Sequence, residues 1–240
     1  MSYVYMKVLE TAPQRYDRGM RLLTAGRLDR LYSDMAARLS PGDRVLDIGC
    51  GTGSLVSLLA AMGCMVTGID VSPAMLAQAQ ERLRDAGLAD GVALLEMGAT
   101  DLDTAFDEDS YDAVTSTLVF SELSVDEIGY TLAQCCRILR AGGRLMIADE
   151  VLPDSIAGRV GTFLLRLPFA VAAFVLTQNT THRVAGLEAR IERAGFEIVE
   201  SCQYLRGTLR LYVAARHRTG DTNCDTDSAA ASATNQSPTS

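Results

Sequence analysis

The sequence predicts an α/β fold in which helices cover both faces of a doubly wound, mostly parallel sheet. Short apolar runs typical of strands alternate with stretches of helical periodicity along most of the chain. The first run, residues 44–48, ends in a glycine-rich turn that leads directly into a predicted helix. With 240 residues and 48% hydrophobic content, the chain can bury one substantial core.

Charge and cysteine usage exclude several classes of function. The net charge is −8, and residues 85–136 contain many acids but no Lys or Arg, which argues against nucleic acid as a partner. The six cysteines form no C-x-x-C pair and no zinc spacing, so we expect reduced cysteines and no metal site. Residues 1–10 lack a signal-peptide pattern, and we therefore expect a cytoplasmic protein.

The N-terminal residues 1–40 are expected to form a helical segment. Residues 16–39 carry apolar side chains near helical spacing, with a break predicted at Gly26 and a stop at 40–42. Tyr16, Asp17 and the arginines that follow are positioned to form a lid over a ligand site. A helix packed on the sheet, with a solvated basic face, is at least as consistent with the same pattern.

The glycine turn has a spacing that separates two classes of ligand. Its glycines, Gly49, Gly51 and Gly53, stand at alternate positions, and Asp47 precedes the first of them by two residues. A dinucleotide fingerprint, G-x-G-x-x-G, requires its third glycine where Ser54 stands here. A dinucleotide site presents exposed backbone amides to pyrophosphate, whereas the acid here would suit a ligand that carries a positive charge.

This D-x-G-x-G-x-G pattern resembles motif I of the class I S-adenosylmethionine-dependent methyltransferases (methyltransferase type 11). The resemblance implies a Rossmann-like, doubly wound sheet of seven strands, mostly parallel, with an antiparallel C-terminal edge strand. It also implies S-adenosylmethionine as the cofactor. The residues that would hold its methionine part are Asp47, Gly49, Cys50, Gly51 and Gly53.

The second predicted strand, residues 65–69, ends in an acid at the distance expected for a nucleoside site. Asp70 would accept both ribose hydroxyls, and Val71 or Met75 would cover the adenine face. Ser72 is the predicted cap of the next helix. The alternative is that Asp70 is an exposed acid stabilised by the helix dipole.

The third predicted strand, residues 92–96, leads into a loop that departs from the family pattern. Relatives usually have Gly-Asp-Ala there, with the acid on the adenine amino group, whereas Ala99 takes the place of that acid here. Either Asp101 reaches in from two residues further on, or backbone groups alone hold the adenine. We assign Ala99, Thr100 and Asp101 to the cofactor site.

The fourth predicted strand begins with residues 111–116 and continues through 117–123, and its end would face the methyl acceptor. We assign Ser116 to the cofactor site and Glu122 to catalysis, as a general base or a hydrogen-bond anchor. A solvated loop acid is an equally good interpretation of Glu122. The acids that end the fifth strand, Asp149 and Glu150, are candidates for the acceptor pocket.

The helix between these strands is predicted by a capping box at Ser124 and Glu127. The fifth strand, 144–148, follows an exit turn at 142–143.

Beyond the fifth strand lies an apolar insertion at about 154–180. Its uninterrupted apolar run is too short to span a bilayer. We expect it to cover the acceptor or to rest on a membrane or partner, with contact through 160–178.

The C-terminal part completes a predicted methyltransferase domain at 41–216. A helix at 184–194 is followed by strands at 197–202 and 208–215, and the polar residues 217–240 form an expected disordered tail. Residues 16–17 with the following helix resemble the menaquinone and ubiquinone C-methyltransferases. Residues 120–123, 147–150 and 176–178 resemble the corrinoid-protein-associated methyltransferases.

These resemblances imply methyl transfer to a small, apolar molecule or a corrinoid-related acceptor, with a corrinoid protein as a candidate partner. The alternatives are a quinone-type C-methyltransferase peripheral to the inner membrane, or a non-catalytic cofactor-binding partner of a corrinoid system.

Overall fold

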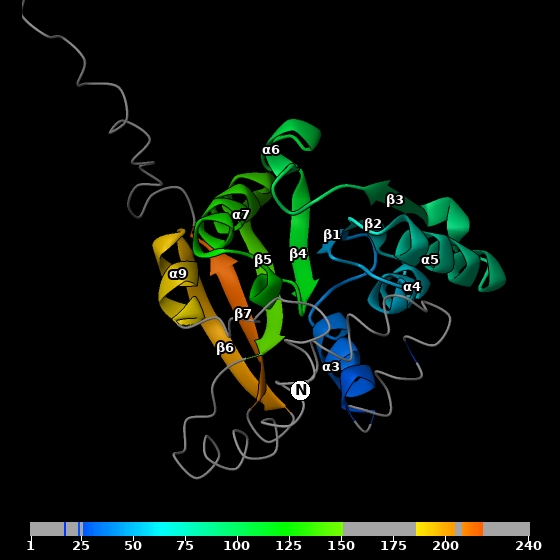
Figure 1. Cartoon of the computed structure of the whole chain (residues 1–240), viewed down its shortest axis with the longest axis horizontal. Coiled ribbons are helices and arrows are strands. Elements are labelled where there is room, and N and C mark those ends of the chain that lie inside the picture. Colours follow the sequence, from blue (N-terminus) through cyan, green and yellow to red (C-terminus); the bar gives the residue numbers. More distant parts are fainter. Residues whose placement is uncertain (1–16, 18–23, 25, 151–185, 205–207, 218–240) are drawn as a thin grey trace, which may run out of the picture.

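The structure is a computed structural model that describes residues 17, 24, 26–150, 186–204 and 208–217. These residues form a seven-stranded sheet in the order β3-β2-β1-β4-β5-β7-β6, with helices on both faces (Figure 1). The strands are β1 Arg44–Ile48, β2 Met65–Asp70, β3 Val92–Glu96, β4 Tyr111–Thr117, β5 Leu139–Glu150, β6 Phe196–Tyr204 and β7 Leu209–Arg216.

Strands β3, β2, β1, β4 and β5 pair in parallel, whereas β7 pairs antiparallel with both β5 and β6. The predicted mostly parallel sheet with antiparallel pairing at its C-terminal side is therefore confirmed. The antiparallel strand lies one place inside the edge, and β6 is outermost. The carboxyl ends of the five parallel strands meet at one edge, where open α/β sheets bind ligands.

Two apolar clusters, one on each face of the sheet, make up the core. On one face, helices α3 (Arg27–Ala36), α4 (Ser54–Ala61) and α5 (Pro73–Asp85) bury side chains such as Leu31 and Leu59. On the other face, α6 (Leu102–Ala105), α7 (Val125–Ile138) and α9 (Leu187–Arg193) bury side chains such as Leu132 and Ile191. The doubly wound arrangement expected from the sequence is thus present.

Helix starts follow the local signals in the sequence. Gly26 precedes α3 in a left-handed conformation, with φ of 71°, where the break was expected. The hydroxyl of Ser72 accepts a hydrogen bond from the Met75 amide at the start of α5. The capping box of α7 is complete, because the Ser124 amide donates to Glu127 at 2.7 Å and the Glu127 amide donates back at 3.3 Å.

The fourth strand is shorter than predicted, and this is a correction. Strand β4 ends at Thr117, and residues 118–123 leave the sheet. Leu118 has a φ of 62°, and its amide donates to the Ala148 carbonyl at 2.8 Å. A single 3₁₀ turn, η2 (Phe120–Glu122), follows. The apolar pattern of 117–123 could not reveal this turn, because its anchor is a strand 30 residues away.

The fifth strand is longer than predicted. Strand β5 begins at Leu139, and the expected exit turn at 142–143 lies inside it, where Gly142 has a φ of 75°. The pairing with β4 shifts register here, so the glycines form an irregularity within a continuous strand. The short helix α6 and the 3₁₀ turn η1 (Ala89–Gly91) were not predicted.

Several sequence expectations fall outside the described residues. These are the apolar insertion at about 154–180, the tail from residue 218, and residues 1–25 of the N-terminal segment except for Asp17 and Thr24. Within the described ranges, none of the helices has the length and apolarity needed to cross a bilayer.

Candidate functional site

The glycine turn between β1 and α4 has a left-handed backbone geometry that glycine adopts without strain. Gly49, Gly51 and Gly53 all have left-handed φ angles, of 69°, 53° and 74°. A Cβ at Gly49 would lie 2.2 Å from Cγ2 of Val119, and one at Gly53 would lie 2.9 Å from Cβ of Ala79. A Cβ at Gly51 would meet nothing within 4 Å. Two of the glycines therefore allow close packing, while the middle one borders open space.

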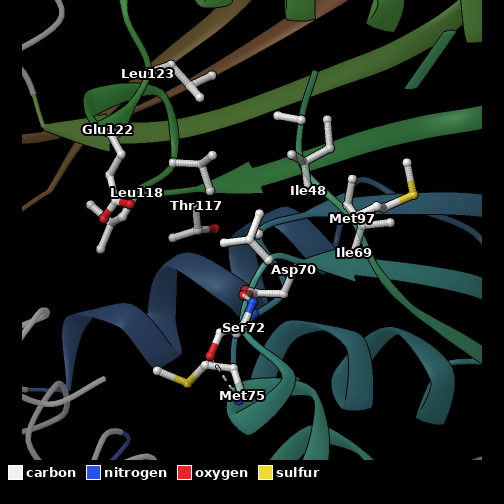
Figure 2. Close-up of a pocket in the computed structure, with 15 residues that line it drawn as sticks. Ile48, Ile69, Asp70, Ser72, Met75, Met97, Thr117, Leu118, Glu122 and Leu123 are labelled. Atoms are coloured by element: carbon white, nitrogen blue, oxygen red, sulfur yellow. Dashed lines mark hydrogen bonds between the residues drawn. The ribbon is translucent and has the colours of Figure 1, made fainter. Parts of the chain in front are cut away.

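That open space belongs to a pocket of about 250 Å³ at the carboxyl ends of β1, β2 and β4 (Figure 2). Most of its lining is apolar, and the polar side chains come from four residues, Asp70, Ser72, Thr117 and Glu122. The full lining is Ile48, Gly49, Gly51, Ile69, Asp70, Val71, Ser72, Met75, Met97, Ala99, Thr117, Leu118, Val119, Glu122 and Leu123. Seven of the residues that we assigned from the sequence are therefore brought together here: Gly49, Gly51, Asp70, Val71, Met75, Ala99 and Glu122.

Asp70 joins the glycine turn to the next helix. One carboxylate oxygen accepts a hydrogen bond from the Gly51 amide at 2.8 Å, and the other accepts from the Ser72 amide at 2.8 Å. A carboxylate has about four acceptor positions, so these two amides leave acceptor capacity on a side chain that lines the pocket (Figure 2). Asp70 thus both lines the pocket and holds the glycine turn and the start of α5 together.

Asp47 lies in β1 and does not line the pocket. Its side chain is buried, and it accepts a hydrogen bond from the Thr115 hydroxyl at 2.6 Å. Burial, which the hydrogen bond from Thr115 partly opposes and the negative charge of Asp70 reinforces, raises the pKa of Asp47 to about 7. The acid of the motif therefore contributes a nearby charge that a cationic ligand would stabilise.

Cys50 is directed away from the pocket and into the core. Its amide donates to the Ile69 carbonyl at 2.9 Å, and a Cβ on Gly68 would lie 3.0 Å from its sulfur. Burial, together with the charges of nearby acids, raises the pKa of the Cys50 thiol. This residue, which we assigned to the cofactor site, packs the turn onto β2.

Three further residues assigned from the sequence, together with Gly53, also lie outside the pocket lining. The buried Ser116 hydroxyl donates to the Ile48 carbonyl at 3.2 Å and so links β4 to β1. Thr100 is exposed, and so is Asp101, whose carboxylate accepts from the Gly98 amide at 2.9 Å. Asp101 therefore shapes the loop that presents Ala99 to the pocket.

Asp17, from the N-terminal part of the chain, contacts the glycine turn. Its carboxylate accepts a hydrogen bond from the Thr52 hydroxyl at 2.6 Å and one from the Ser54 hydroxyl at 3.5 Å. It also forms an ion pair with Arg82 of α5. One acid from far along the chain thus bridges the two elements that flank the pocket.

The opposite wall comes from the turn after β4. Leu118, Val119 and Leu123 supply apolar surface there, and Glu122 supplies the acid (Figure 2). The sequence indicated this run as acceptor-facing but did not identify these three apolar residues individually. Ser72, Met97, Thr117 and the strand residues Ile48 and Ile69 were likewise not assigned to the site.

Asp149 and Glu150, the acids proposed from the sequence for the acceptor pocket, do not line it. Asp149 is completely buried at the end of β5, and its carboxylate accepts a hydrogen bond from the Ser121 amide at 3.0 Å. The reason for the difference is the turn at 118–122, which lies between the end of β5 and the pocket.

This chain is similar to known methyltransferases in both sequence and fold. Residues 45–143 match a family model described as a methyltransferase domain. A demethylmenaquinone methyltransferase from Symbiobacterium thermophilum is 26% identical over 89% of this chain and 93% of its own length. A 2-phytyl-1,4-naphthoquinone methyltransferase from Synechococcus elongatus is 39% identical over 53% of this chain and 56% of its own. A solved SAM-dependent methyltransferase from Aquifex aeolicus has a TM-score of 0.59 at 18% identity, covering 86% and 97% of the two chains.

Proposed function

Because this chain is a class I S-adenosylmethionine-dependent methyltransferase, we propose that its acceptor is an apolar molecule of the quinol type, methylated at a ring carbon. The observation that carries the proposal is the wall of the pocket formed by Leu118, Val119 and Leu123, with Glu122 as its acid. A flat apolar ring with a hydroxyl group matches that combination of surfaces. The names of the relatives from Symbiobacterium and Synechococcus support the same class of acceptor.

The residues present fit the cofactor. The space in front of Gly51 lets a ligand approach the backbone closely, and the spare acceptor positions of Asp70 suit two ribose hydroxyls. Val71 lines the pocket although 72% of its surface is exposed, so an apolar face is available for the adenine. Met75 and Met97 add polarizable surface around it.

When bound, S-adenosylmethionine supplies a methyl group on a sulfonium, and sulfur keeps the electron pair of the breaking S–CH₃ bond as the acceptor carbon forms its new bond. The protein aligns the reactants and excludes water. In our proposal Glu122 accepts the proton of the ring hydroxyl, which raises electron density on the carbon beside it. The hydrogen on that carbon leaves to solvent when the ring regains aromaticity.

Replacing the proposed base tests this function. We expect Glu122→Gln to lower kcat for methylation of a reduced 2-prenyl-1,4-naphthoquinone about 100-fold, because the amide cannot accept the hydroxyl proton. The dissociation constant for S-adenosylmethionine should stay within about twofold, since the acid lies on the acceptor side. Labelled-methyl transfer and calorimetry measure the two quantities. Asp126→Asn, in the first turn of α7, is the matched control and should change neither. Full activity of Glu122→Gln would refute the proposed role.

A corrinoid acceptor in the same pocket would need no base. A reduced cobalt centre is itself the nucleophile and carries no hydroxyl proton, so Glu122→Gln would leave the rate of transfer unchanged. The naphthoquinol assay and a parallel assay with a corrinoid protein therefore separate the two acceptors. Transfer to the corrinoid protein alone would overturn the quinol proposal.

We also propose that the N-terminal residues 1–40 act as a lid over the pocket. The bonds of Asp17 to Thr52 and Arg82 support a segment that covers the methionine end of the pocket. Contact with a membrane surface through 160–178 also belongs to the proposed function, because an acceptor with a long apolar tail resides in the bilayer.

The raised pKa of Asp47 predicts how the affinity for S-adenosylmethionine depends on pH. Its folded-state pKa of about 7 lies above the ordinary value of 3.8, so its protonated form persists in the free protein at mildly acidic pH. A cationic ligand favours the carboxylate, and binding must therefore release a proton below pH 7. The same shift means that the contribution of Asp47 to stability is largest below pH 3.8 and is lost as the pH rises to about 7.

We therefore expect the affinity for S-adenosylmethionine to rise about three- to tenfold from pH 5.5 to 6.5 and to level off near pH 7.5. Calorimetric titrations at these three pH values measure the effect. Asp47→Asn, which cannot ionise, should show a flat profile. If the variant keeps the wild-type slope, a group other than Asp47 is responsible.

A further inference from the structure

We propose that Asp149 is a positioning residue for the methyl acceptor, because its carboxylate holds the turn that places Glu122 and the apolar wall in the pocket. The acceptor side of this inference rests on the function proposed above. Its structural side rests on contacts that involve no ligand. Asp149 touches neither the pocket nor the reacting atoms, so it acts through the turn η2.

The first anchor of the turn is the carboxylate itself. Asp149 has no exposed surface; one oxygen accepts from the Ser121 amide at 3.0 Å and the other from the Glu150 amide at 2.6 Å. In the part of the chain that the structure describes, no Lys or Arg forms an ion pair with it. Burial raises its pKa to about 7. A buried carboxylate without a cation costs stability, which favours a role other than holding the fold together.

The second anchor lies at the other end of the same turn. The Leu118 amide donates to the Ala148 carbonyl at 2.8 Å, while Leu118 adopts its left-handed conformation. Two adjacent residues at the end of β5, Ala148 and Asp149, therefore hold the turn at both ends. The Glu122 amide then closes it by donating to the Val119 carbonyl at 2.9 Å.

The turn leaves little room for adjustment on its inner side. Val119 packs so closely on the glycine turn that a Cβ at Gly49 would lie 2.2 Å from its Cγ2. A turn released at Ser121 can therefore shift only toward the pocket or toward solvent. Either shift moves Glu122 and the apolar wall, while Asp70 and the glycine turn stay in place because their own hydrogen bonds do not involve η2.

Amide exchange and kinetics of two variants test this assignment. In Asp149→Ala, hydrogen exchange at the Ser121 amide should accelerate at least about tenfold, because its hydrogen bond to the Asp149 side chain is lost. In the full chain, kcat/KM for the reduced 2-prenyl-1,4-naphthoquinone should fall about tenfold, and the dissociation constant for S-adenosylmethionine should stay within about twofold. Asp149→Asn keeps one acceptor oxygen and should recover part of both losses.

The matched control is Asp112→Asn. Asp112 also accepts a backbone amide, that of Arg44 at 2.6 Å, and it lies at the opposite end of β4. The Asp112→Asn variant should lower the stability of the fold without changing hydrogen exchange at the Ser121 amide. It should also leave kcat/KM for the acceptor and the dissociation constant for S-adenosylmethionine in the same ratio as in the wild type.

The outcomes separate the two proposals. Wild-type exchange at Ser121 in Asp149→Ala overturns the inference, as does an equal loss of cofactor affinity and acceptor turnover. If Asp149→Ala does not fold, the exchange and kinetic measurements on Asp149→Asn decide between these results. A wild-type protein that leaves the naphthoquinol unmethylated contradicts the proposed acceptor, whereas exchange at Ser121 still tests the role of Asp149.

Discussion

Asp70→Ala is expected to bind S-adenosylmethionine about 100-fold more weakly than the wild type, because two charge-assisted hydrogen bonds are lost together. The carboxylate accepts from the Gly51 and Ser72 amides, and its remaining acceptor positions suit the ribose hydroxyls. Alanine removes the ribose contact and also releases the glycine turn. The loss should therefore exceed that of a residue that only touches the ligand.

Calorimetric titration of the cofactor into both proteins measures this effect. Asp101→Ala is the matched control, because Asp101 also accepts a backbone amide, at 2.9 Å, but is exposed and does not line the pocket. We expect it to weaken binding by less than about threefold, as for a surface bond. Affinity of Asp70→Ala within threefold of the wild type would remove Asp70 from the cofactor site.

The parts of the site that the sequence predicts are those encoded over a few neighbouring residues. The turn at 49–53 follows a buried strand directly, so its glycine spacing reports on local backbone geometry, and the three left-handed φ angles agree with it. Asp70 is likewise predictable, because an acid at the end of the second strand must lie at the same sheet edge. The cap at Ser72 and the capping box at Ser124 are local in the same sense.

The parts that the sequence does not predict depend on contacts between distant segments. Leu118 and Ser121 bond to Ala148 and Asp149, and this pairing turns a run with strand-like composition into the pocket wall. Cys50 stands within the motif, yet it packs against Gly68 of the next strand rather than against the ligand. Local patterns cannot determine which side of a turn a residue occupies when tertiary packing decides it.

The thermal stability of two glycine variants should differ strongly, and Gly53→Ala should show the larger loss. Its left-handed φ of 74° costs a non-glycine residue about 1–2 kcal/mol. A Cβ there would also lie 2.9 Å from Cβ and 3.2 Å from Cα of Ala79 in α5, and such overpacking costs about 1–3 kcal/mol. Together these effects, about 2–5 kcal/mol, predict a fall in Tm of about 4–20 °C for a chain of this size.

Gly51→Ala separates the effect of a Cβ on ligand binding from its effect on the stability of the fold. It shares the left-handed conformation, with φ of 53°, but its Cβ would meet no protein atom within 4 Å. Only the cost of the left-handed φ, about 1–2 kcal/mol, remains, so its Tm should fall by about 2–8 °C. Its affinity for S-adenosylmethionine should fall at least about tenfold because the methyl group enters the pocket. Calorimetry of unfolding and of binding measures both quantities. Equal loss of Tm in the two variants would mean that conformational strain alone, and not the space that each glycine borders, explains the motif.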